Sequence, residues 1–410
     1  MTVNRTPPAT GVAARSSPWT AGQWALLFVL SGNMLLDAVE VSVVLVALPT
    51  VSNAMGMPLM VVQYLMSGFA LGFAALLLLG NRMAARWGRR TIYLAAMAVF
   101  ALASVAGGLT DHGALLIATR VVKGCCAALT APTGLAIIGS AFPEGAQQRK
   151  AVSVYSMFGA TGFTTGLLLS GALVTSSWRW TFLFPAPIAL ALLLIAARLI
   201  PADPGVVRPV PRLRLTLLSN RRLLRSGIGA ATLNGTYAGL LVLVTFQIQR
   251  QLGWSPWQCA LALLPACVPL MAAVPFSGRL VGRWGTERLI ASGALASFLG
   301  CAWYLWRAPS ESYWTAILPT LLLVEAAFVC SFAALNMQAT ATIAPTERAP
   351  AVSLYQAGVQ VGGVVTLPLA TLLLTLGHSY RPALSLITTI SAVGLLAALT
   401  GLSGAARRTP

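Results

Sequence analysis

The sequence predicts an all-α membrane protein with twelve transmembrane helices. Composition is the first reason: of 410 residues, 57% are hydrophobic and only 9% are charged, whereas a soluble protein carries about 25% charged residues. The second reason is that apolar runs long enough to cross a bilayer recur along nearly the whole chain. Strand-like alternation is absent, which argues against a β-barrel.

These apolar runs divide the chain into two bundles. We expect helices over residues 24–48, 59–80, 92–110, 115–141, 152–174, 181–200, 226–249, 257–277, 289–306, 314–342, 352–376 and 382–402. The first run is too long and too acidic for a cleaved signal peptide. The domains are therefore an N-terminal tail (1–23), a six-helix bundle (24–200), a linker (201–225), a second six-helix bundle (226–402) and a C-terminal tail (403–410).

The basic residues predict the orientation. Loops on the side of both termini hold 21 Lys and Arg, and loops on the other side hold 4. By the positive-inside rule both termini are cytoplasmic. The linker's basic, leucine-rich part has two interpretations, a segment lying on the membrane surface or a solvated linker.

Charge and cysteine content exclude several classes. The net charge of +18 is spread over short loops, which does not fit nucleic-acid binding. The six cysteines lie in apolar runs and imply no disulfide or metal framework. His112 and His378 suggest no metal site either. The excess of Arg over Lys, 25 to 2, is typical of a GC-rich bacterial genome, so we expect a bacterial plasma membrane.

The two halves repeat. Asn81–Arg90 reads NRMAARWGRR, and Gly278–Glu287, 197 residues later, reads GRLVGRWGTE. Ala151–Tyr155 reads AVSVY, and Ala351–Tyr355, 200 residues later, reads AVSLY. Two matches at nearly one offset indicate a parallel repeat of six helices, the arrangement of secondary transporters that bind substrate near the midplane between the halves.

Four stretches resemble motifs of the major facilitator superfamily, and within it the drug:proton antiporters. The loop after the second helix is similar to G-x-L-A-D-R-x-G-R-R. The other three are in the fourth helix (Arg120, Gly124, Ala127, Ala128), at the sixth (Trp178, Arg179, Trp180, Phe182, Pro187) and before and within the eighth (Leu252, Gly253, Trp254, Ser255, Pro256, Leu264, Pro265). The resemblance covers essentially the whole chain and implies two pseudo-symmetric halves that transport by alternating access.

The resemblance also implies a cytoplasmic gate, formed by Arg86, Gly88, Arg89, Arg90, Arg283 and Gly285. The family's acidic latch is absent, because Ala85 and Gly282 occupy its two positions. We therefore expect the gate arginines to meet helix C-termini or other acids.

Two further positions depart from the family pattern. Lys123 replaces a glutamine, and the proline of the antiporter motif G-P-x-x-G is Leu167. The loss of this proline restores a backbone hydrogen bond and removes a kink. We interpret the regularly spaced glycines nearby and in the eleventh helix as helix-packing residues, namely Gly159, Gly162, Gly166, Gly358 and Gly362.

Embedded charges suggest proton coupling. Asp37 and Glu40 share one face of the first helix, where each ionised acid costs about 2.5–3.5 kcal/mol. Arg120 and Lys123 are similarly spaced on the fourth helix. Antiparallel helices would pair Glu40 with Arg120 and Asp37 with Lys123, although a Glu40–Lys123 pair fits almost as well. No nucleotide-binding motif occurs, so an ion gradient must supply the energy.

These four residues and Glu325 are the proton-coupling candidates. The alternative for the four is a static salt-bridge network. Glu325 has three interpretations: a protonated packing residue, a second proton site or an anchor for a cationic substrate.

Polar side chains in the predicted cavity helices are candidates for substrate contact: Asn33, Gln63, Tyr64, Asn234, Tyr237, Asn336, Gln356 and Gln360. The alternative for each is a bond to a neighbouring helix. A cavity with few charges suits a moderately hydrophobic organic compound. We expect a monomeric proton-coupled exporter, with no enzymatic activity and no cofactor or metal. An importer is the second hypothesis, and a transport-inactive sensor or scaffold the third.

Overall fold

The computed structural model describes residues 19–143, 145–201, 217, 219–273, 276–307, 312–344, 347–377 and 379–406. Within these residues, twelve helices are long and apolar enough to cross a membrane. The predicted all-α class and the number of spans are confirmed. Most of the predicted linker and the distal parts of both tails lie outside the described residues.

The first half contains eight helical segments. They are α1 (Ala21–Ala54), α2 (Leu59–Val62), α3 (Tyr64–Trp87), α4 (Arg89–Leu109), α5 (Gly113–Ala141), α6 (Ala146–Ser176), α7 (Trp180–Leu183) and α8 (Pro185–Leu199). In the second half, α9 (Arg221–Phe246) continues as a π-helix (Gln247–Gln251). The remaining α-helices are α10 (Pro256–Leu263), α11 (Val268–Ala273), α12 (Ser277–Trp284), α13 (Thr286–Arg307), α14 (Leu318–Thr340), α15 (Arg348–Gly377) and α16 (Tyr380–Ala406). A second π-helix (Tyr313–Ile317) leads directly into α14.

Several helices begin or end outside the predicted spans. The first begins at Ala21 because Thr20 and Gln23 form a reciprocal capping box. The side chain of Asn220 accepts the amides of Arg222 and Leu223 at 3.1 Å each, so α9 begins inside the predicted linker. The last helix continues to Ala406, into the predicted C-terminal tail. Caps and polar ends extend helices beyond the apolar runs that predicted them.

The eighth span is broken, and the prediction of one continuous helix over 257–277 is wrong. Helix α10 ends at Leu263, a 3₁₀ turn covers Leu264–Ala266, and α11 follows from Val268. Pro265 and Pro269 lack the amide hydrogens that a continuous helix needs. The exposed carbonyl oxygen of Ala266 accepts a hydrogen bond from the hydroxyl of Tyr237 at 2.5 Å.

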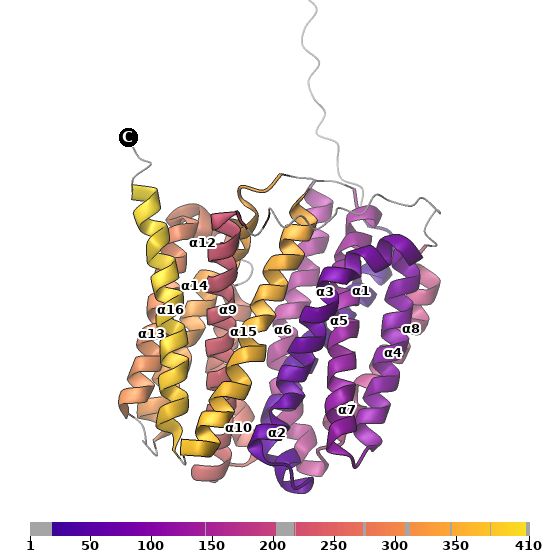
Figure 1. Ribbon diagram of the computed structural model, residues 1–410. Coiled ribbons are helices and arrows are strands. Elements are labelled where there is room, and N and C mark those ends of the chain that lie inside the picture. The colour runs from indigo at the N-terminus through magenta and orange to yellow at the C-terminus, as the bar shows by residue number, and fades with distance from the viewer. Residues whose placement is uncertain are drawn as a thin grey trace, which may run out of the picture.

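The most extensive contacts between the two halves lie along two helix pairs. Helix α3 packs against α15, and α6 packs against α10; Figure 1 shows α3 and α15 side by side at the centre. The repeat is visible in the loops after α3 and α12, where Gly88 (φ 84°) and Gly285 (φ 77°) adopt the same positive-φ conformation.

A shared hydrophobic core closes the interface at the end opposite the termini. This core joins Val43–Val51 of α1 to Leu240–Ile248 around the end of α9. Gln249 Nε2 donates to Val46 O at 2.9 Å, and Arg250 donates to Ser52 Oγ at 3.0 Å. Towards the termini each half has its own core instead, and among the described residues a small cluster around Leu77, Ala128 and Ala357 joins them.

Four of the five predicted packing glycines lie at close helix crossings. A Cβ on Gly162 would lie 2.6 Å from Leu35 O, and one on Gly166 would lie 2.7 Å from Val39 O, both on α1. A Cβ on Gly159 would lie 2.8 Å from Met34 Cε. In the second half, a Cβ on Gly362 would lie 1.9 Å from Ala231 O on α9. A Cβ on Gly358, one turn earlier, would lie 4.0 Å from the nearest atom, Gly227 O.

We predict that Gly362→Ala destabilises the protein by about 1–3 kcal/mol, because the added methyl forces α15 away from the backbone of α9. Gly358→Ala is the matched control, with the same substitution in the same helix and room for the methyl. Thermal unfolding of both purified variants in detergent measures the difference. Equal melting temperatures would contradict the close contact.

Candidate functional site

Glu40 is the centre of a buried ionic cluster between α1 and α5. Its carboxylate forms ion pairs with the guanidinium of Arg120 and with Lys123 Nζ, the latter at 2.5 Å. Arg120 also donates to the backbone carbonyls of Glu40 at 2.8 Å and of Leu65 at 2.7 Å. The cluster therefore connects α1, α3 and α5.

All three charged side chains are sealed from solvent. Glu40, Arg120 and Lys123 are each 0% exposed. The Arg120 guanidinium lies 4.9 Å from the ring centre of Phe69, and Lys123 Nζ lies 5.1 Å from that of Phe100. Aromatic faces attract cations, which partly replaces the lost hydration.

Asp37 has a different environment. It is 7% exposed, the highest exposure among the four charged residues of this region. Its Oδ2 accepts hydrogen bonds from Thr130 Oγ1 at 3.0 Å and from Asn33 Nδ2 at 3.2 Å. With all four side chains ionised the group is neutral, and protonation of Asp37 changes its net charge to +1.

The expected Glu40–Arg120 pair is present, but the expected Asp37–Lys123 pair is not. Lys123 pairs with Glu40, the alternative that the helix depths also allowed. Helices α1 and α5 are antiparallel, so residues further along α5 lie level with Asp37. Thr130 occupies that level, and the long Lys123 side chain reaches Glu40.

Sequence reasoning missed Thr130 and Phe100. A signal existed for Thr130, because it continues the face of α5 that carries Arg120 and Lys123, at helical spacing. Phe100 is one of many apolar residues in α4, and nothing in the sequence distinguishes it.

Glu325 lies in the opposite half, on α14, and is 1% exposed. Its Oε1 accepts the amide of Leu270, on α11, at 2.7 Å. Its Oε2 is buried and has no hydrogen-bond partner. Among the described residues no cationic side chain lies within ion-pair distance of it.

The eight residues predicted to contact substrate do not form one cluster. Five make hydrogen bonds within the protein: Asn33 to Asp37, Gln63 to Met60 and Ser67, Asn234 to Val359, Tyr237 to Ala266, and Asn336 to Phe332. Tyr64 is exposed, and Gln356 and Gln360 are half-buried. The polar groups are therefore largely engaged with neighbouring backbone and side chains.

Aromatic rings connect the halves. Phe163 of α6 lies 5.9 Å from Tyr237 of α9, centre to centre, and Tyr237 lies 4.5 Å from Phe328 of α14. Phe328 stacks with Phe332 at 6.1 Å. We call these four residues the aromatic array.

The predicted gate arginines contact helix carbonyls of their own half. Arg89 donates to Ala136 O at 3.2 Å, and Arg90 donates to Ala197 O, in the last turn of α8, at 2.6 Å. Cations are favoured at such helix ends. The guanidinium of Arg86 lies 5.8 Å from the ring centre of Trp87. Arg283 is exposed at the equivalent position of the second half.

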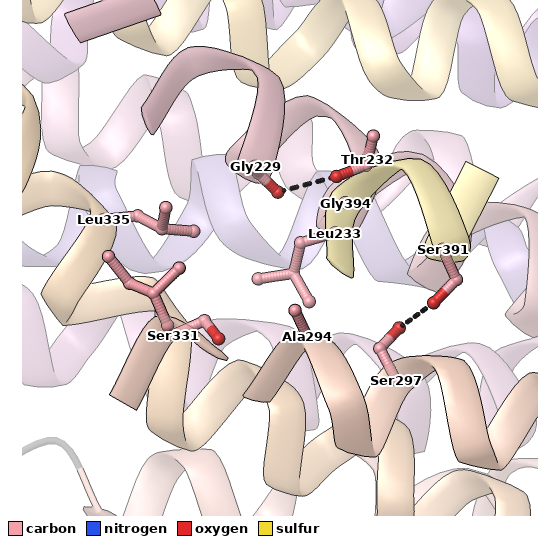
Figure 2. A pocket seen from close by; sticks show the side chains of 10 residues that line it. Gly229, Thr232, Leu233, Ala294, Ser297, Ser331, Leu335, Ser391 and Gly394 are labelled. Atoms are coloured by element: carbon pink, nitrogen blue, oxygen red, sulfur yellow. Dashed lines mark hydrogen bonds between the residues drawn. The ribbon is translucent and has the colours of Figure 1, made fainter. Parts of the chain in front are cut away.

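A small cavity lies inside the second half, among α9, α13, α14 and α16 (Figure 2). Ser297 and Ser391 hydrogen-bond across it at 3.0 Å, and the hydroxyl of Ser331 is buried without a partner. Its volume of about 20 Å³ suffices for one water molecule. An organic substrate would not fit.

The described residues contain no group of three or more His, Cys, Asp or Glu side chains placed to hold a metal ion.

Comparison with known proteins identifies the family. The profile of the Major Facilitator Superfamily matches residues 30–344. The chain therefore belongs to this superfamily of secondary transporters.

Two relatives cover most of the sequence. The puromycin resistance protein pur8 of Streptomyces alboniger is 29% identical, over 86% of this chain and 82% of the relative. The cephamycin export protein CmcT of Amycolatopsis lactamdurans is 27% identical, over 93% and 90%.

Solved structures share the fold. An inward-facing bacterial homologue of the human lysosomal transporter Spinster superposes with a TM-score of 0.74 at 18% identity, over 95% of this chain and 98% of that one. A D-xylose–proton symporter also gives 0.74, at 15% identity, over 92% and 97%. At these identities the likeness shows the shared fold alone.

We predict that Glu40→Gln destabilises the protein by about 3–5 kcal/mol, because Arg120 and Lys123 then stay buried without their carboxylate. Adding Lys123→Met removes one unpaired cation and should recover part of the loss. A double-mutant cycle of unfolding free energies measures this coupling. Simple additivity would mean that Lys123 and Glu40 do not interact.

Proposed function

We propose that the protein is a proton-coupled exporter of a moderately hydrophobic organic compound, acting as a monomer in a bacterial plasma membrane. The observation that carries the proposal is the difference between the environments of the two buried acids, Glu40 and Asp37. Glu40 is sealed and held by two cations, whereas Asp37 retains some exposure and only neutral partners. Asp37 is thus the member of the group that can exchange a proton.

Burial explains why one proton can matter. Glu40 lies between Arg120 and Lys123, and gain or loss of a proton at Asp37 changes the charge of the group by one unit. An uncompensated charge is costly in a low-dielectric interior. The two protonation states therefore favour different packing around α1, which touches α5, α6 and α9.

The proposed orientation places both termini in the cytoplasm. The shared core then closes the outer end, and the inner ends of the two halves hold separate cores. In this arrangement substrate enters from the cytoplasm. Gate closure on that side would bring the loops after α3 and α12 towards the opposite half.

The relatives support export as the direction. Their names refer to resistance against puromycin and export of cephamycin. Apolar and aromatic side chains between the halves also suit such compounds better than a sugar, which requires a denser set of polar groups.

We predict that Asp37→Asn abolishes proton-driven transport while the protein remains folded, because asparagine keeps polar contacts with Thr130 and Asn33 but cannot exchange a proton. The assay is puromycin uptake into inside-out vesicles under an imposed pH gradient. Asp111→Asn is the control, since Asp111 is 81% exposed in a loop. Unchanged transport by the Asp37 variant would refute the proton role.

Direction of transport has its own test. An exporter makes a puromycin-sensitive bacterium more resistant, whereas an importer makes it more sensitive or leaves it unchanged. The comparison uses strains producing the wild type, the Asp37→Asn variant or no transporter. Increased sensitivity with the wild type would favour the importer.

A further inference from the structure

We infer that a groove between α13 and α14, at the end of the molecule opposite the termini, binds one anionic phospholipid. The groove has a volume of about 540 Å³ and is lined by Leu299, Ala302, Trp303, Trp306, Pro319 and Leu323. This volume is within the range of about 300–1,000 Å³ that is typical of ligand pockets. The inference goes beyond the proposed function, because the groove belongs to the second half alone.

One face of α13 forms the longer wall of the groove. Its four lining residues recur at helical spacing, from Leu299 through Ala302 and Trp303 to Trp306, which places them on one side of the helix. Leu299 and Trp306 are exposed, and α13 lies at the edge of the second half (Figure 1). The groove therefore opens away from the bundle, towards the lipid.

Hydrogen bonds between the two segments keep the groove in shape. Pro319 has no amide hydrogen to donate to the carbonyl of Thr315, one turn earlier. The indole N–H of Trp303 donates to this carbonyl at 3.0 Å. Deeper in the bundle, Thr320 Oγ1 donates to Gly300 O at 3.2 Å. The ring of Trp303 is thus held as a fixed wall, and a ligand meets a preformed surface.

A cationic side chain lies at the mouth of the groove. The guanidinium of Arg307 lies 5.7 Å from the ring centre of Trp303 and 5.9 Å from that of Trp306. Arg307 is exposed and forms no ion pair with any described residue. Tryptophans such as Trp306, which is 70% exposed, are typical of the level of the lipid head groups. Arg307 can therefore meet a head group there.

The apolar groove and the arginine together define the occupant. An apolar molecule would leave Arg307 without an anion, and a soluble phosphate would leave the groove unfilled. A phospholipid satisfies both, with its phosphate at Arg307 and an acyl chain along Leu299 and Leu323. A guanidinium binds phosphate oxygens in pairs, and it repels a head group that carries an amine. Phosphatidylglycerol should therefore bind better than phosphatidylcholine.

The test is native mass spectrometry of the delipidated protein in detergent, titrated with phosphatidylglycerol or phosphatidylcholine. We expect the wild type to bind its first phosphatidylglycerol more tightly than its first phosphatidylcholine. Arg307→Gln should weaken the first phosphatidylglycerol by about fivefold, because it removes the charge at the mouth. Ala302→Phe should also weaken it, because the added ring fills the groove while the charge remains.

Arg283→Gln is the matched control. It removes another exposed arginine beside an exposed tryptophan, Trp284, at the opposite end of the bundle. Since it reports the general attraction of basic residues for anionic lipid, it should leave the affinity for the first lipid unchanged. Both arginine variants should keep the wild-type melting temperature in lipid-free detergent.

Four outcomes would overturn the inference. They are equal affinity of the wild type for the two lipids, wild-type affinity in Arg307→Gln or Ala302→Phe, and an equal loss in Arg283→Gln. The fourth is a dimer that Ala302→Phe dissociates, which would assign the groove to a second copy of the chain.

The result does not depend on the proposed function. Lipid binding in detergent requires neither a proton gradient nor a transported compound, so it can be observed even if Asp37→Asn leaves transport unchanged. Conversely, proton-driven puromycin transport that requires Asp37 can be observed even if the groove binds no lipid.

Discussion

The double ion pair of Glu40 is the constraint on which the first half depends. One carboxylate holds both Arg120 and Lys123, and Arg120 also binds the backbone of α1 and α3. Buried pairs of this kind are weak evidence for stability, because apolar packing of the same volume is often as favourable. Their value here is geometric. They fix α1 against α5 where the three charged side chains are closed to solvent, and so fix the surroundings of Asp37, the residue that we propose exchanges a proton.

Helix crossings around α1 reinforce this placement. Gly162 and Gly166 bring α6 close to the backbone of α1, so that a side chain at either position would displace one helix. The second half has a looser element, the broken span between α10 and α11, whose free backbone groups are bound by Tyr237 and Glu325. A tight first half and a hinged second half suit a transporter in which the halves must move relative to one another.

Repetition and hydrophobicity predicted the fold because both are properties of the chain itself. Twelve apolar runs and two loops with Arg-Trp-Gly define the spans and the duplicated halves. The sequence could not predict contacts that depend on relative depth and rotation of helices. Lys123 could reach either Asp37 or Glu40, and the packing of α5 on α1 determines that it pairs with Glu40. The polar residues of the predicted cavity likewise bond to neighbours, because a nearby carbonyl satisfies an amide as well as a ligand would.

The two unusual acids lie in different halves, and this separation constrains how coupling can work. Asp37 belongs to a group whose charges balance, and Glu325 forms no ion pair with any described residue. On the proposed function, a proton at Asp37 and a substrate between the halves need not displace one another directly. Coupling must then pass through conformation. Helix α6 can transmit it, because it contacts both α1 and the aromatic array. Its glycines pack against α1, and its Phe163 lies against the ring of Tyr237. A change in the packing of α1 after proton transfer would shift α6 and, with it, one wall of the aromatic array.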